Sequence, residues 1–245
     1  MINDSTDQVD LDDVRRRAAL LTDADAALRS ALSQLDAADV SRPSRLPGWT
    51  IGHVISHLAR NAEALANLLR WASTGVETPM YSSSESRDAD VEAGARRPGM
   101  QILADYAATS DALAADIASM PDDAWAARVR TRTGGPIPAD VVLDHRIAEV
   151  FLHHHDLGVD GGLAELSDKD AVGLLEVLMR TYVRTHEVPP LVLAAIGGAR
   201  HVLGAADPGA PVVSGSAGAL AGWLTGRSDG SELVCDGPLP ELPSW

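Results

Sequence analysis

The chain has 245 residues, 45% of them hydrophobic and 22% charged, and its 35 acidic and 20 basic residues give a net charge of −15. A surface this acidic repels phosphate backbones and anionic lipid, so we expect neither nucleic-acid nor membrane binding. No apolar run approaches the roughly 20 residues of a membrane span. The polar, acidic first residues are unlike a targeting peptide, which predicts a cytoplasmic protein.

Four long amphipathic helices are predicted in the first part of the chain. Apolar residues recur at three- and four-residue steps over residues 11–35, between Thr50 and Gly75, between Gly99 and Pro121, and from about 139 to 155. Thr50 has the residue type of an N-cap for the second helix. Residues 74–99 are expected to form a loop with at most a short acidic helix, residues 129–133 an extended segment, and GGPIP a turn. Four such helices favour an antiparallel bundle.

The sequence changes character after Leu157, where GVDGG interrupts the helical pattern. A helix is predicted over residues 167–185, followed by an apolar run at 191–196 and short runs at 201–203, 211–213 and 232–235. These runs alternate with one helix over residues 216–225. We therefore predict a mainly α protein in which a bundle of residues 1–160 precedes a small α+β domain of residues 161–245. An irregular tail that wraps the bundle is the alternative.

Histidines gather on two of the predicted helices and indicate a metal site. Glu149 and His153 are four residues apart, so both side chains lie on one face of a helix, and His53 and His57 have the same spacing. In an antiparallel bundle these two faces can meet at one interior site. Two imidazoles and a carboxylate suit zinc or ferrous iron with positions left open. The spacing also fits solvated Glu–His pairs without a metal, and we interpret His57 as a core histidine beside the site.

Several sequence blocks, in the same order, resemble the mycothiol-dependent maleylpyruvate isomerases, a family within the DinB-like superfamily of metal-binding four-helix bundles. The blocks cover nearly the whole chain and are PGWTIGHVISHLARNAEAL, WASTGVETPMYSS, AEVFLHHHDLG, VSGSAGALAGWLTGRSDG and PLPELPSW. The resemblance implies a zinc ion, or another divalent metal, bound by His53, Glu149 and His153. It also implies a functional arginine at Arg227 and pocket-lining residues at Met80 and Tyr81.

The same resemblance implies an activity. Enzymes of this family convert maleylpyruvate to fumarylpyruvate in gentisate breakdown, with mycothiol as an unconsumed cofactor. A thiolate adds to the double bond, the resulting single bond rotates, and the thiolate leaves. Zinc can deprotonate a coordinated thiol or polarise the substrate carbonyl. The nucleophile is then external, and Cys235, the only cysteine, is expected to be a buried structural thiol.

Arg227 is the residue that we expect to bind a substrate carboxylate, because a guanidinium matches a carboxylate with two parallel hydrogen bonds. Arg60 is a weaker candidate for that role. The expected partners are a small-molecule substrate and a low-molecular-weight thiol, and the chain is expected to be a monomer or a homodimer.

Two other functions fit the sequence. A mycothiol S-transferase would use the same bundle and metal but leave the thiol on its electrophile, and the ligand set does not separate these two activities. A non-catalytic metal- or thiol-binding module would need neither an open coordination position nor the C-terminal arginine. The sequence assigns no role to His154 or His155.

Overall fold

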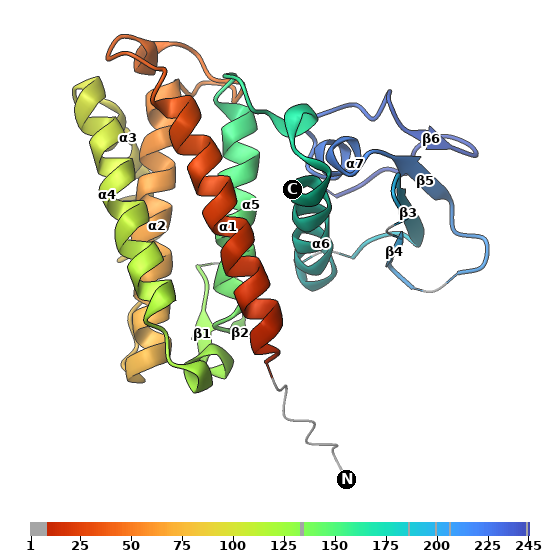
Figure 1. The fold of residues 1–245 in the computed structure, drawn as a ribbon, viewed down its shortest axis with the longest axis horizontal. Helices are drawn as coiled ribbons and strands as arrows, with labels where there is room; N and C mark the ends of the chain where they lie inside the picture. The colour runs from red at the N-terminus through yellow and green to blue at the C-terminus, as the bar shows by residue number, and fades with distance from the viewer. Residues whose placement is uncertain (1–8, 133–134, 186, 199, 206, 244) are drawn as a thin grey trace. The chain divides into compact units, whose positions relative to one another are not determined.

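A computed structural model describes residues 9–132, 135–185, 187–198, 200–205, 207–243 and 245. The chain divides into two compact units, Met1–Val159 and Asp160–Trp245. The first unit is helical apart from one short hairpin, and the second combines helices with a small sheet (Figure 1). The predicted fold class, mainly α with a smaller α+β part, is confirmed.

Four long helices and a shorter one form the first unit. They are α1 (Leu11–Leu32), α2 (Ile51–Thr74), α3 (Ser84–Ala95), α4 (Gly99–Ala118) and α5 (Val141–Asp156), with short 3-10 helices at Asp39–Ser41 and Asp122–Ala126. The second long helix lies in the middle of the unit, and α3, α4 and α5 all pack against it. Fifteen of its residues are buried, more than in any other helix of this unit. Side chains on the buried face of α2 are therefore restrained by packing against the neighbouring helices.

The direction of the helices differs in part from a simple antiparallel bundle. In Figure 1 the colour sequence shows α1 and α5 running one way and α2 and α4 the other. Gly52, at the start of α2, lies beside Ile102, near the start of α4, as two parallel helices require. Residues 75–98, which include the 12-residue α3, carry the chain back along the bundle. Helices α2 and α5, the two that carry the histidines, are antiparallel as expected.

The short acidic helix that the sequence allowed within residues 74–99 is α3, which begins at a capping box between Ser83 and Ser86 but buries only Val91. One other local prediction for the first unit needs correction. The expected turn GGPIP contributes β2 (Pro136–Pro138), which pairs antiparallel with β1 (Arg128–Arg130). Proline has no backbone N–H to donate to a strand ladder, so a Pro–Ile–Pro segment can form only an edge strand. Both strands of this two-stranded sheet are edge strands.

Gly99 fixes the close approach of α4 to the loop before α2. A β-carbon at this position would lie 2.4 Å from the carbonyl oxygen of Ala37 and 2.8 Å from its α-carbon. Gly99→Ala should therefore lower the free energy of unfolding by about 1–3 kcal/mol, the usual cost of overpacking. Thermal unfolding should show a decrease of about 2–4 °C per kcal/mol. Gly135→Ala is the matched control, because nothing lies within 4 Å of its added carbon; an equal melting temperature for the two variants would contradict the prediction.

The second unit is a four-stranded sheet with two helices. Its elements are α6 (Asp168–Thr185), β3 (Leu191–Ala195), β4 (Arg200–Leu203), β5 (Val212–Gly215), α7 (Ala217–Leu224) and β6 (Val234–Cys235), with a 3-10 turn at Leu163–Glu165. The strand order is β4-β3-β5-β6, with β3 and β5 parallel and both outer pairs antiparallel. Alternate residues of β3 are buried together with residues of α6 and α7. The hydroxyl of Tyr182 donates to the carbonyls of Leu224 and Pro243, which ties the last residues to this core.

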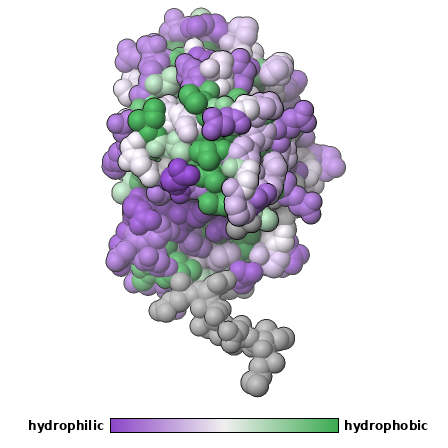
Figure 2. All heavy atoms as spheres, turned by 90° about the vertical axis from the view of Figure 1, so that its right-hand side faces the viewer, coloured by the Kyte–Doolittle hydropathy of each residue, from purple (hydrophilic) through white to green (hydrophobic). Residues whose placement is uncertain are grey.

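Some valines of this sheet remain open to solvent. Val202 on β4 is 58% exposed and Val234 on β6 is 69% exposed. Figure 2, which looks from the side of β5 and β6 in Figure 1, shows hydrophobic side chains gathered in the middle of a mostly hydrophilic surface. No described helix is long and apolar enough to cross a membrane.

Candidate metal centre

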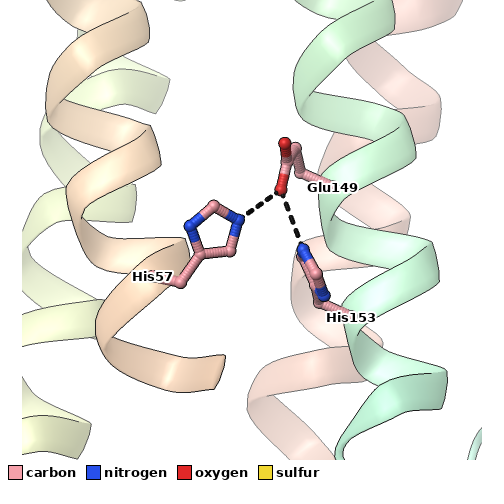
Figure 3. A group of neighbouring side chains, drawn as sticks. All are labelled: His57, Glu149 and His153. Carbon is pink, nitrogen blue, oxygen red and sulfur yellow. Dashed lines mark hydrogen bonds and ion pairs between the residues drawn. The ribbon is translucent and has the colours of Figure 1, made fainter. Parts of the chain in front are cut away.

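Three side chains from α2 and α5 meet inside the first unit. The Nε2 atom of His57 lies 2.8 Å from Oε2 of Glu149, and Nε2 of His153 lies 3.1 Å from the same oxygen. The possible ligand atoms of the three residues are all within 4.8 Å of one another. Figure 3 shows the two imidazoles approaching the carboxylate from different helices. Among the described residues this is the one His/Cys/Asp/Glu group of this kind.

The helical spacing explains how the group forms. Glu149 and His153 are successive residues on one face of α5, so the carboxylate lies above the imidazole. His57 comes from the facing helix, and its ring packs edge-on against the ring of His153 with 4.7 Å between centroids. The His57 side chain is 7% exposed and that of His153 14%, whereas Glu149 retains 30%. The cluster is therefore shielded but not sealed from solvent.

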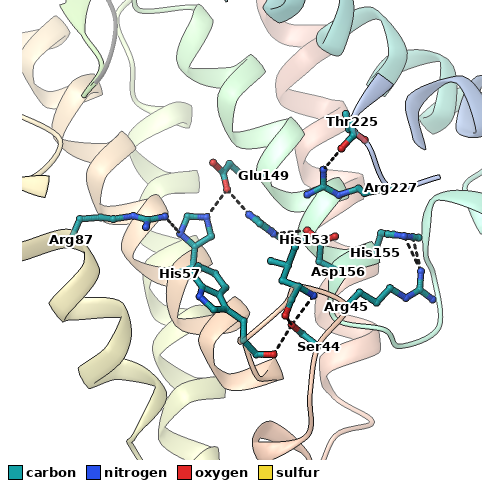
Figure 4. Close-up of polar contacts among 12 residues, drawn as sticks. Ser44, Arg45, His57, Arg87, Glu149, His153, His155, Asp156, Thr225 and Arg227 are labelled. Atoms are coloured by element: carbon teal, nitrogen blue, oxygen red, sulfur yellow. Dashed lines mark hydrogen bonds and ion pairs between the residues drawn. The ribbon is translucent and has the colours of Figure 1, made fainter. Parts of the chain in front are cut away.

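Further side chains hold the two imidazoles in orientation. Oδ2 of Asp156, which is 2% exposed, accepts a hydrogen bond from Nδ1 of His153 at 2.9 Å. An Nη2 proton of Arg87, on α3, points at Nδ1 of His57 at 3.1 Å (Figure 4). The carboxylate below His153 is the usual partner of a metal-binding imidazole, because it fixes the ring and leaves Nε2 as the ligand atom.

The charges of the cluster shift its titration. Burial opposes ionisation of Glu149, but the imidazoles of His57 and His153 hold the pKa of this carboxyl well below its usual range. Burial also disfavours the charged form of His153, yet its hydrogen bonds to Asp156 and Glu149 raise its pKa to about 9. For His57, burial lowers the pKa in spite of the attraction to Glu149. Without a metal, His153 thus carries the positive charge that balances Glu149.

The donor chemistry fits a divalent ion. Two imidazole nitrogens and one carboxylate oxygen are a usual ligand set for zinc, with one or more positions left for other ligands. An ion at this place would replace the Nε2 protons of both imidazoles. On His57 this requires a proton on Nδ1, so the present contact from Arg87 to that nitrogen would have to be given up.

His53, the expected first ligand, lies outside the cluster that His57 forms with Glu149 and His153. The backbone N–H of Thr50 donates to Nδ1 of His53 at 3.2 Å, and Oγ1 of Thr50 accepts from the His53 backbone N–H at 3.3 Å. His53, the third residue of α2, is thus the partner of Thr50 in a capping box at the start of this helix. Its Nε2 atom faces Glu92 at 3.4 Å. His57, interpreted above as a core histidine, takes the place expected for His53.

The expected pocket residues lie on the segment between α2 and α3. Met80 and Tyr81 line a cavity of about 260 Å³ together with Trp71, Arg130 and Arg132. Burial raises the pKa of Tyr81, and the charge of Glu149 raises it further, so this phenol lies within electrostatic range of the cluster.

Arg227 lies in the second unit, in the turn after α7. Its backbone N–H donates to the carbonyl of Gly222, and its Nη1 donates to the carbonyl of Thr225 at 3.1 Å. The side chain is partly exposed. Arg60, the weaker candidate, is partly buried and forms ion pairs with Asp105 at 2.9 Å and Glu63 at 3.2 Å.

Two residues of the site were missed by the sequence analysis. Asp156 could have been found, because it follows His153 by three residues on the same helix and is a suitable partner for the second ring nitrogen. Arg87 lies 30 residues from His57 in a polar stretch, and no spacing rule connects the two. The neighbouring histidines stay outside the cluster: His154 is buried, and His155 contacts Arg45.

The fold and the cluster together define a helical-bundle protein with an interior His/Glu/His site. The family model for the mycothiol maleylpyruvate isomerase N-terminal domain matches residues 21–158, more than half of the chain. The protein therefore belongs to the mycothiol maleylpyruvate isomerase family, and the resemblance found in the sequence is confirmed.

Solved structures extend the similarity to 95% of the chain. The crystal structure of the mycothiol-dependent maleylpyruvate isomerase is 29% identical, with a TM-score of 0.81 over 95% of this chain and 97% of that one. A variant of that enzyme with one histidine replaced by alanine gives a TM-score of 0.80 at the same identity and coverage. No curated protein matches the sequence.

Proposed function

We propose that the protein is a metal- and mycothiol-dependent cis–trans isomerase that converts maleylpyruvate to fumarylpyruvate. The observation that carries the proposal is the convergence of His57, Glu149 and His153 in a fold of this family. We further propose that zinc is the metal, and that the protein acts in the cytoplasm in gentisate breakdown.

The roles of the cluster follow from its contacts. His57, Glu149 and His153 would hold the ion, and Asp156 would keep the His153 ring turned so that Nε2 faces it. A bound divalent ion supplies a Lewis acid, which lowers the pKa of a coordinated thiol and polarises a carbonyl. The thiol supplies the nucleophile that adds to the double bond and is released after rotation about the resulting single bond.

Cations near the cluster suit a dianionic substrate. The protein as a whole is strongly acidic, so a carboxylate needs a local positive charge in order to bind. Arg87 provides such a charge beside the cluster, because it contacts His57 directly and interacts with Tyr81. With His57 holding an ion through Nε2, its Nδ1 would carry a proton, and the guanidinium of Arg87 would then be available to a carboxylate. Arg227 remains our proposed second partner for such an anion.

The activity can be tested by following maleylpyruvate by ultraviolet absorbance with metal-loaded protein. We expect fumarylpyruvate to form only when mycothiol is present, while the amount of free thiol stays constant. Chelation of the metal should stop the reaction, and metal returned in excess should restore it. Stoichiometric loss of thiol with an adduct as product would instead identify an S-transferase. Metal binding without any reaction of maleylpyruvate or other electrophiles would favour a binding module.

The nucleophile is expected to be external, so Cys235→Ser should retain the activity of the native protein when mycothiol is supplied. Cys235 belongs to β6 and is partly exposed, which corrects its expected burial, and its Sγ atom lies 3.9 Å from the carbonyl oxygen of Pro238. Rates of the two proteins at saturating mycothiol give the comparison. An inactive but correctly folded variant would make Cys235 the nucleophile and contradict the mechanism.

A further inference from the structure

Arg146 is a fully buried arginine in the middle of the bundle. It lies on α5, three residues before Glu149, and is 2% exposed. Its Nη1 donates to the backbone carbonyl of Leu58 at 2.8 Å and to Oδ1 of Asn61 at 2.9 Å, and its Nη2 donates to Oγ of Ser110 at 2.9 Å. All three acceptors are neutral. This side chain is not used by the metal cluster or by the proposed reaction.

Burial of this charge costs free energy, and an ion pair does not offset that cost. Within the described residues, no carboxylate comes within the 4.0 Å of an ion pair with Arg146; Asp25 and Glu149 attract it only from farther away. An apolar side chain of similar volume generally fills such a place at lower cost than an ion. What Arg146 offers instead is its hydrogen bonds, together with a position over the Tyr106 ring, whose centroid lies 5.9 Å from the guanidinium carbon.

Those hydrogen bonds join the two helices that carry the cluster. Leu58 directly follows His57 on α2, and Asn61 lies one helical turn beyond His57 on the same helix. One end of the guanidinium thus binds the turn of α2 that presents His57, while its own backbone lies one turn before Glu149 on α5. The other end binds Ser110 on α4, a helix that contributes nothing to the cluster.

We propose that Arg146 is a positioning residue for the metal centre: it sets the distance between His57 and the Glu149–His153 pair by holding α2 against α5. Hydrogen bonds from a rigid, planar guanidinium fix both separation and rotation, which apolar contact between two helices does not. The inference rests on the proposed metal site. It assigns the two ends of Arg146 different importance, because the Leu58–Asn61 end joins ligand-bearing helices and the Ser110 end does not.

The test measures the affinity of the metal-free protein for Co²⁺ and the visible absorption of the bound ion. Arg146→Met and Asn61→Ala should each bind Co²⁺ about tenfold more weakly or worse and change its absorption spectrum, as loss of an outer hydrogen bond does at other metal sites. Arg146→Lys should recover only part of the affinity. Ser110→Ala should keep the native affinity and spectrum. Leu28→Ala, which opens a cavity in α1, is the control for lost stability, and it should lower the melting temperature while leaving the Co²⁺ spectrum unchanged.

The outcomes separate this inference from the proposed function. A native protein that does not bind Co²⁺ would refute the metal centre itself. A native protein that binds Co²⁺, together with an Arg146→Met variant of equal affinity and spectrum, would overturn the positioning role alone. Equal losses in Ser110→Ala and Asn61→Ala would also overturn it, because they would make Arg146 a general packing residue of the bundle. If Arg146→Met does not fold, Asn61→Ala and Ser110→Ala still decide the question.

Discussion

Replacing His57 by alanine is expected to remove the bound metal and to lower kcat/KM for maleylpyruvate about a thousandfold, since a Lewis-acid contribution of about 4 kcal/mol equals three factors of ten. His57 supplies the one imidazole of the cluster that comes from α2, and Glu149 and His153 cannot enclose an ion from α5 alone. Metal content by elemental analysis and the rate of fumarylpyruvate formation check the prediction. Added metal should not restore the variant at concentrations that saturate the native protein.

His53→Ala is the matched control, because it removes the same side chain one turn earlier on the same helix. The variant should keep its metal and most of its activity. It loses the capping contact with Thr50, so the free energy of unfolding should fall by about 0.5–1 kcal/mol. Loss of the metal in His53→Ala, with full metal content in His57→Ala, would restore the ligand set expected from the sequence and refute the one proposed here.

The choice between His53 and His57 shows what spacing alone can decide. Glu149 and His153 could be paired from the sequence, because two residues four apart on a helix share one face. His53 and His57 share a face in the same way, so periodicity could not rank them. The missing information was local: Thr50 lies three residues before His53, and a capping box uses the side chain at that position. Thr50 was predicted as the N-cap, but its partner three residues later was not, and that further step would have distinguished His53 from His57.

The elements that were predicted well are those with a long apolar stripe. Helices α1, α2, α4 and α5 each bury a face against the bundle, so the period of their apolar residues was readable. Helix α3 buries only Val91, and β2 is Pro–Ile–Pro, so neither leaves such a pattern. The parallel course of α2 and α4 depends on how residues 75–98 return along the bundle, which amphipathicity does not encode.

Arg227→Ala is expected to lower kcat/KM for maleylpyruvate about ten- to hundredfold, because loss of one charge-assisted hydrogen bond costs about 1.5–3 kcal/mol. Two observations support this role for Arg227. The net charge of −15 makes a local cation necessary for a dianionic substrate, and Arg227 lies in an exposed turn after α7. Arg227→Lys should recover only part of the loss, since an ammonium group cannot form the two parallel hydrogen bonds of a guanidinium. The metal content of both variants should equal that of the native protein.

Arg87→Ala, measured beside Arg227→Ala, identifies which arginine binds the anion. Arg87 contacts His57 in the first unit, so its loss should also alter the affinity for Co²⁺, whereas loss of Arg227 should not. The kcat/KM values of each single variant and of the double variant show whether the two losses are independent, because independent losses multiply. Near-native kcat/KM in Arg227→Ala, with a large loss in Arg87→Ala, would place anion binding entirely on the first unit. Arg227 would then have only a structural role in its turn, and binding of this carboxylate would not be the function of the second unit.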